Sequence, residues 1–176
     1  MPISLRPAVL DDLVAINAIY NHYVEHSTCT YQTVPSTLPE RSAWFDAHGP
    51  EHPVIVAEDN DQVVGWGSLS RFHPRQAYCH SVEDSVYLHH EHQGRGIGSL
   101  LLDALMQACT ERGFRQMIAV IGDGTGASVG SRRLHERAGF RLIGVAEKVG
   151  FKHGRWLDQM LMQKELGEGD RTPPDL

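Results

Sequence analysis

The segment from residue 86 to residue 99 limits the possible fold more than any other part of the chain. It reads VYLHHEHQGRGIGS, and apolar residues at helical spacing follow it. Glycine tolerates positive φ and has no side chain to block approach, so successive backbone N–H groups can converge on an anion. The N-terminus of the next helix adds a partial positive charge. The segment therefore predicts a strand, an anion-binding turn and a helix. An ordinary helix start after a glycine-rich turn is the simpler alternative.

The rest of the pattern predicts a single α/β domain. Apolar and β-branched runs predict strands at 3–6, 53–58, 62–70, 82–88, 117–121, 140–151 and 157–165. Helical spacing predicts helices after Asp12, after Thr37 and over 98–112 and 128–138, the last two ending at Gly113 and Gly139. Such an alternation favours a mixed sheet flanked by helices. Residues 1–166 form this domain, and the polar, Gly- and Pro-rich residues 167–176 predict a flexible tail.

Composition narrows the class of protein. The chain has 176 residues and a net charge of −6, without the basic stripe of a nucleic-acid binder. Its cysteines, Cys29, Cys79 and Cys109, form no CxxC pair, which favours a reducing compartment and argues against disulfides or a zinc site. No apolar run has the length of a signal peptide or a membrane span. We therefore expect a cytoplasmic protein that binds neither nucleic acid nor membrane.

The spacing Gln93-x-x-Gly96-x-Gly98 resembles the pyrophosphate loop of the GNAT superfamily of N-acetyltransferases. Residues 132–140, RRLHERAGF, and the opening IxLRPA are also similar to that family, so the resemblance extends to about Glu165. It implies the GNAT fold, with a mixed, mostly antiparallel twisted sheet flanked by helices, and an enzyme that uses acetyl-CoA as co-substrate. The residues that it implies as cofactor contacts are Val86, Tyr87, Leu88, Gln93, Gly94, Arg95, Gly96, Ile97, Gly98, Ser99 and Ser128.

Within the superfamily, the chain resembles the phosphinothricin N-acetyltransferase group. The shared stretches are YNHYV at 20–24, VExSVYL at 82–88, AVIG at 119–122, LHE at 134–136 and GFKHGRWxD at 150–158. This resemblance implies acetylation of the α-amine of a small anionic glutamate-like amino acid, such as phosphinothricin, arsinothricin or methionine sulfoximine, with a role in resistance. It also implies a homodimer, which the aromatic residues Trp44, Phe45 and Trp66 favour as excess apolar surface. The alternatives are a GNAT enzyme for another amine or a protein N-terminus, and a non-catalytic acyl-CoA sensor.

Two residues match the catalytic positions of that group. Glu83 matches the proposed general base, a role that requires burial to raise its pKa or a relaying water. Its neighbour Asp84 should point to the opposite face of the sheet, because strand side chains alternate. His135 lies where many GNAT enzymes have a tyrosine, and we expect it to assist proton movement on the thiolate side because imidazole titrates near neutral pH. The simpler alternatives are a solvated carboxylate and a histidine on a helix surface.

The resemblance also implies a set of substrate contacts. They are Tyr31, Arg75, Tyr78, Val120 and Gly122. Arg75 could bind the anionic group of the substrate with two parallel hydrogen bonds, although an exposed loop charge is the simpler alternative.

Two features depart from the group or suggest another chemistry. Ser128 stands where the group usually carries an asparagine. The run His89-His90-x-His92 could suggest a metal site, but we expect no metal, because no cysteine lies near it. Since no cysteine falls within these motifs, we expect the amine to attack the thioester directly, with a backbone N–H near Val86 or Leu88 free to bind the carbonyl oxygen.

Overall fold

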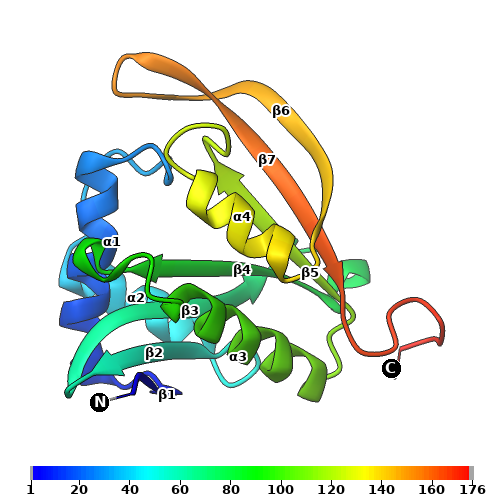
Figure 1. Ribbon diagram of the computed structural model, residues 1–176. Coiled ribbons are helices and arrows are strands. Elements are labelled where there is room, and N and C mark those ends of the chain that lie inside the picture. The colour runs from blue at the N-terminus through cyan, green and yellow to red at the C-terminus, as the bar shows by residue number, and fades with distance from the viewer. Residues whose placement is uncertain (1, 175–176) are drawn as a thin grey trace.

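The computed structural model describes residues 2–174 as three layers, with a central sheet between two pairs of helices (Figure 1). In that range the sheet has seven strands in the order β1-β2-β3-β4-β5-β7-β6. Its neighbours are antiparallel except for β4 and β5, which are parallel. The strands are β1 (Ser4–Pro7), β2 (Val54–Asp59), β3 (Gln62–Arg71), β4 (Ser81–Leu88), β5 (Gln116–Gly122), β6 (Arg141–Lys152) and β7 (Arg155–Glu165).

The helices begin and end where the sequence predicts, within a few residues. They are α1 (Leu13–His26), α2 (Leu38–His48), α3 (Ile97–Glu111) and α4 (Val129–Arg137). A capping box starts α2: the Thr37 hydroxyl accepts from the Glu40 N–H, and the Glu40 carboxylate accepts from the Thr37 N–H. Gly113 and Gly139 follow α3 and α4 with φ values of 76° and 85°, the left-handed conformation that ends a helix. The order of strands and helices is therefore the predicted one.

Each face of the sheet has its own hydrophobic core. Val56 and Trp66 pack on one face with Ile16 of α1 and with aromatic side chains of α2. Leu69 and Met117 pack on the other face with residues of α3 and α4. Because strand residues alternate between faces, side chains along β4 point in turn to the α1–α2 layer and to the α3–α4 layer.

The end of the chain continues past β7 as turns. Arg115 donates hydrogen bonds to the Gly169 carbonyl and to the Thr172 hydroxyl, at 3.3 and 3.2 Å. The expected flexibility of residues 167–176 stays a prediction, and residues 175 and 176 lie outside the described range. Within residues 2–174, none of the helices combines the length and the apolar character that a membrane crossing requires.

Candidate active site

Strands β4 and β5 separate halfway along their length. Their parallel pairing runs from Ser81 opposite Gln116 to Asp84 opposite Ala119 and stops there. From Ser85 to Leu88, the edge of β4 that faces β5 therefore has no ladder partner in that strand. This opening matches the predicted splay around Val86 and Leu88, where a free backbone N–H could bind a carbonyl oxygen.

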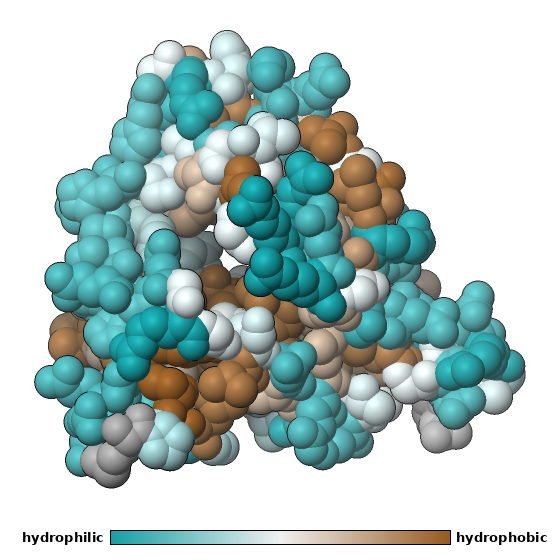
Figure 2. Space-filling model, viewed as in Figure 1, coloured by the Kyte–Doolittle hydropathy of each residue, from teal (hydrophilic) through white to brown (hydrophobic). Residues whose placement is uncertain are grey.

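Two cavities, one toward each helical layer, meet at this opening. The first, which we call the α2 cavity, measures about 340 Å³ and has Arg41, Trp44 and His48 of α2 in its wall. The second, the glycine-loop cavity, measures about 510 Å³ and is lined by the 93–99 turn and by α4. The residues common to both walls are Cys29, Ser85, Tyr87 and Val120. Space-filling representation shows a hollow at the centre of the molecule (Figure 2).

The glycine-rich turn has the backbone conformation that the sequence predicts. Gly94 and Gly96 have φ values of 74° and 79°, and α3 begins directly after Gly96. The Gln93 side chain donates to the Tyr23 hydroxyl at 2.7 Å, and that hydroxyl donates to the Leu88 carbonyl at 2.6 Å, which ties the turn to α1. The predicted cofactor contacts that line this cavity are Val86, Tyr87, Leu88, Gln93, Gly94, Gly96, Gly98, Ser99 and Ser128.

Two predicted cofactor contacts have side chains that do not line the cavity. Arg95 forms an ion pair with Asp59 at 2.7 Å. Ile97 is fully buried and packs with Ala57 and Leu101 in the core. Their side chains are therefore held by the protein itself. At these two positions, the backbone N–H groups at the start of α3 are the groups that can bind an anion.

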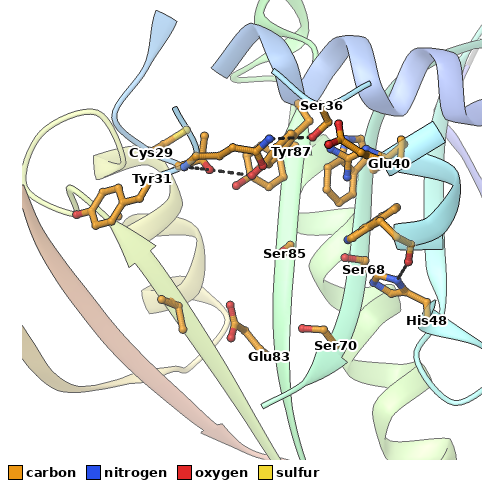
Figure 3. Close-up of a pocket in the computed structure, with 18 of the residues that line it drawn as sticks. Cys29, Tyr31, Ser36, Glu40, His48, Ser68, Ser70, Glu83, Ser85 and Tyr87 are labelled. Atoms are coloured by element: carbon orange, nitrogen blue, oxygen red, sulfur yellow. Dashed lines mark hydrogen bonds between the residues drawn. The ribbon is translucent and has the colours of Figure 1, made fainter. Parts of the chain in front are cut away.

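Glu83 points into the α2 cavity near Ser70 and Ser85 (Figure 3). Burial, and to a lesser degree the negative charge of Asp84, raises the pKa of the Glu83 carboxyl above its ordinary value. None of the residues in 2–174 forms a hydrogen bond or ion pair with this carboxylate. A half-buried carboxylate with a raised pKa is a stronger base than an exposed one, as a general base requires.

Asp84 points the other way, as the strand alternation predicts, and forms a buried pair with His135 of α4. Nε2 of His135 lies 3.0 Å from Oδ2 of Asp84, and Nδ1 lies 2.8 Å from the Ser131 carbonyl. Burial alone would lower the pKa of His135, but the hydrogen bond and charge of Asp84 outweigh it, so the net pKa is raised. Because the Ser131 carbonyl can only accept, Nδ1 carries a proton, and the raised pKa means that the pair with Asp84 stabilises the protonated ring.

The predicted substrate contacts divide into two groups. Tyr31, Val120 and Gly122 line the α2 cavity. The Tyr31 hydroxyl donates to the Asp158 carbonyl, and its ring lies so close to Gly122 and Gly150 that a Cβ at either position would come within 2.9 Å of it. Glycine at both positions therefore leaves room for the Tyr31 ring.

Arg75 and Tyr78 lie outside this cavity. Both are exposed on the loop between β3 and β4, where Tyr78 packs against His73 with ring centroids 4.6 Å apart. Within one chain, neither side chain is part of the wall that holds Glu83. Their contact with substrate stays a prediction.

The structure adds residues that the motifs did not indicate. Cys29 lies at the junction of both cavities, and Arg41 lines the α2 cavity. Asp123 organises the glycine-rich loop from 122 to 130, because its carboxylate accepts from the Thr28 hydroxyl, from the Ala127 N–H at 3.2 Å and from Arg155 at 2.7 Å. Ser128 at the start of α4 is buried in that loop and lines the glycine-loop cavity. These placements depend on contacts between segments far apart in the sequence.

Histidines from two elements gather beside the glycine loop. His22 of α1 stacks on His90 with ring centroids 4.0 Å apart. One ligand-type atom from each of His89, His90 and Glu91 lies within 4.8 Å of the others, which is close enough for a metal ion. The expectation of no metal therefore stays a prediction.

The aromatic residues that favoured a homodimer in the sequence are not surface residues. Trp66 is 2% exposed, and Trp44 and Phe45 pack against the same core as Trp66. The β6–β7 hairpin carries a larger set of exposed apolar residues, which are Leu142, Ile143, Val145, Val149, Phe151 and Trp156. These rings pack largely within one chain and so do not support a dimer, and the homodimer stays a prediction.

Comparison with known proteins agrees with this geometry. Residues 16–140 match the model of the acetyltransferase (GNAT) family. The chain is 41% identical over 94% of its length to a phosphinothricin N-acetyltransferase of Alcaligenes faecalis, of which it covers 83%. It is 39% identical over 98% of its length to an L-methionine sulfoximine/L-methionine sulfone acetyltransferase of Pseudomonas paraeruginosa, of which it covers 100%.

A solved structure gives the same result for the fold. A GNAT superfamily phosphinothricin acetyltransferase from Sinorhizobium meliloti, crystallised in complex with AcCoA, superimposes with a TM-score of 0.94. It is 45% identical, and the match covers 99% of this chain and 94% of that one. The loop, the splayed strands and these likenesses converge on one assignment: the chain belongs to the acetyltransferase (GNAT) family.

Proposed function

We propose that this protein transfers the acetyl group of acetyl-CoA to the α-amine of a small, acidic, glutamate-like amino acid. The observation that carries this proposal is the meeting of two cavities at the gap between β4 and β5. The glycine-loop cavity, with its helix N-terminus and positive-φ glycines, suits the pyrophosphate of acetyl-CoA. The α2 cavity, with Glu83 in its wall, suits a small amine acceptor.

The amine attacks the thioester carbonyl at the junction of the cavities. Glu83 lies two residues before Ser85 on β4, roughly 7 Å along the strand, so it takes the ammonium proton through a water. Burial raises the pKa of the Cys29 thiol at the same junction, which keeps it protonated and a poor nucleophile. This supports direct transfer without an acyl-enzyme.

His135 acts on the cofactor side. It lines the glycine-loop cavity, and Asp84 and Ser131 fix its ring. Because both ring nitrogens bond to these partners, we assign to His135 a positive charge that stabilises the departing thiolate of CoA. Asp84 is a positioning residue in this proposal, since it acts by holding His135.

The proposal extends to the biological setting. Acetylation removes the positive charge of the α-amine, so the enzyme would inactivate phosphinothricin, arsinothricin or methionine sulfoximine and give resistance. Cys29, Cys79 and Cys109 are all unpaired thiols, which supports a reducing, cytoplasmic location.

A thiol-release assay tests the proposed function. Purified protein and acetyl-CoA are mixed with L-phosphinothricin, arsinothricin and L-methionine sulfoximine, and with spermidine and a peptide N-terminus as controls. We expect kcat/KM for at least one glutamate analogue to exceed that of both controls by a factor of ten or more. Turnover of only the polyamine or the peptide would contradict the proposal.

The glycine loop gives a first prediction. Gly96→Val should weaken acetyl-CoA binding, because a β-branched residue is strained at the φ of 79°. Gly98→Val should also weaken acetyl-CoA binding, because its Cβ would lie 3.3 Å from the Leu134 side chain in the wall of the cavity. Isothermal titration calorimetry measures the affinity. Gly49→Val is the matched control, because Gly49 has a φ of 58° but lies at the end of α2, outside both cavities.

A homodimer through the β6–β7 hairpin gives a second prediction. β6 is an edge strand, and Val145 and Trp156 of the hairpin are 45% and 60% exposed, a combination that favours pairing with another chain. The wild type should sediment as a dimer at micromolar concentration, and Val145→Glu with Trp156→Glu should sediment as a monomer. Val14→Glu, at an equally exposed position on α1, should leave the dimer intact. A monomeric wild type would refute the dimer.

A further inference from the structure

Arg41 is a buried cation without an acidic partner. It lies on α2, is 4% exposed and lines the α2 cavity. Its guanidinium carbon lies 4.6 Å from the centre of the Tyr20 ring and 4.7 Å from that of Trp44, so two aromatic side chains hold the guanidinium group. Burial lowers the pKa of Arg41. Such a charge is costly in a protein interior unless a partner compensates it.

Within residues 2–174, the Arg41 guanidinium forms a hydrogen bond through Nε alone. Nε of Arg41 donates to Oδ1 of Asn17 at 3.2 Å, and Asn17 is itself fixed by a bond from its amide to the Ser36 carbonyl. Among residues 2–174, no carboxylate lies within ion-pairing distance of the Arg41 guanidinium. The acids in the wall of the cavity are Glu40, whose carboxylate accepts from the N–H and hydroxyl of Thr37, and Glu83.

A second donor without a partner lies in the same wall. Trp66 is 2% exposed, and its Nε1–H is buried without a hydrogen-bond partner in the described residues. Its ring packs against Trp44, with centroids 5.4 Å apart, so the indole is at the same side of the cavity as Arg41. Buried donors are rarely left unpaired in native proteins. His48 adds an acceptor: its Nδ1–H donates to the Trp44 carbonyl, and Nε2 is unpaired.

Arg41 and Trp66 lie on the side of the α2 cavity that an anionic group of the substrate could reach. Figure 3 shows the cavity running from Tyr31, beside β5, to Glu40 and His48, which mark α2 on the opposite side. Trp66 pairs with Tyr87 in the sheet, and Tyr87 lies two residues past Ser85, roughly 7 Å along β4. Tyr87 also lines both cavities, so an amino acid with its α-amine at the junction has an anionic group within reach of Trp66 and Arg41.

We propose that Arg41, with the Trp66 indole N–H, binds the acidic head at the end of the substrate side chain. Arg41 then determines the preference for acidic over neutral heads. This inference rests on the proposed acetylation of small amino acids and adds Arg41 to the substrate contacts that the sequence resemblance implies. A phosphinate or carboxylate head supplies the missing counter-charge, and a neutral sulfone supplies only hydrogen-bond acceptors.

Steady-state kinetics with two acceptors tests this role. The acceptors are phosphinothricin, whose phosphinate is anionic, and methionine sulfone, whose head is neutral. Arg41→Gln should raise KM for phosphinothricin by about 10- to 100-fold, the effect of losing a hydrogen bond to a charged group. It should raise KM for methionine sulfone much less and leave kcat within a few-fold. Arg112→Gln, the same substitution at an exposed arginine at the end of α3 and outside both cavities, should leave both KM values unchanged.

Failure of the proposed role of Arg41 and failure of the proposed function would give different results. A wild type that acetylates neither acceptor would overturn the proposed function and this inference together. If the wild type acetylates phosphinothricin but Arg41→Gln raises both KM values equally, only the role of Arg41 is refuted.

Two further measurements do not depend on the stability of Arg41→Gln. Arg41→Lys keeps the charge and most of the packing, and it should give a smaller rise in the KM for phosphinothricin. In ¹⁵N-labelled wild type, phosphinothricin should shift the Trp66 indole N–H resonance. An unmoved resonance at saturating phosphinothricin would contradict the proposal.

Discussion

Glu83→Gln is expected to lower kcat by about 10²- to 10⁴-fold, the usual contribution of a general base. Glutamine keeps the size and polarity of the side chain but cannot accept the ammonium proton. Affinity for acetyl-CoA should be unchanged, because Glu83 faces the α2 cavity and not the glycine-loop cavity. Stopped-flow and steady-state assays measure the rate, and calorimetry measures the affinity. Glu25→Gln, an exposed carboxylate on α1, is the matched control.

The dependence of kcat on pH should follow the ionisation of Glu83. A base acts in its deprotonated form, so activity rises as the pH passes through the Glu83 pKa. Burial raises that pKa, so the acidic limb of kcat should lie above the ordinary pKa of a glutamate, about 4.3. Glu83→Gln should abolish this limb. A variant that keeps both full kcat and the limb would show that another group takes the proton.

His135→Ala is expected to lower kcat by about 10²- to 10³-fold, because in the proposed mechanism it removes the positive charge that stabilises the thiolate. It also leaves Asp84 buried without its partner, since Oδ1 of Asp84 has none and Oδ2 bonds to His135. The melting temperature should therefore fall. Asp84→Asn should keep the ring near its place but remove the counter-charge.

NMR separates a positioning role from a purely structural one. The raised pKa of His135 means that the pair stabilises the protein fully below the ordinary imidazole pKa of about 6.5, and that this contribution is lost as the pH rises through the folded-state value. In a ¹⁵N titration, wild-type His135 should titrate above 6.5, and Asp84→Asn should lower its pKa and kcat together. A lowered pKa with unchanged kcat would refute the role of the His135 charge in catalysis.

The sequence alone predicted the parts of the site that depend on local pattern. Positive φ at Gly94 and Gly96 followed from the glycine-rich turn, and the opposite directions of Glu83 and Asp84 followed from strand alternation. The start of a helix after Thr37 was predictable for the same reason, since its capping box involves residues three apart.

Long-range packing explains what the sequence could not predict. Whether an arginine lines a cavity depends on where its helix or loop packs. Residue type alone therefore could not show that Arg41 on α2 is buried and that Arg75 lies on an exposed loop. The same limit applies to Trp66, which belongs to the core because α1 and α2 cover that face of the sheet. Asp123 organises its loop through Thr28 and Arg155, which are distant in sequence.

Single-turnover labelling shows whether the acetyl group moves directly to the α-amine of a small acidic amino acid. Enzyme in excess is mixed with acetyl-CoA carrying a ¹⁴C-acetyl group, with and without phosphinothricin, and the label is located by chromatography and mass spectrometry. Direct transfer predicts label on the α-nitrogen of phosphinothricin, none on the protein, and the same result with Cys29→Ala. Label retained on the protein before the acceptor is added, or no labelled amino acid after a full turnover time, would contradict it.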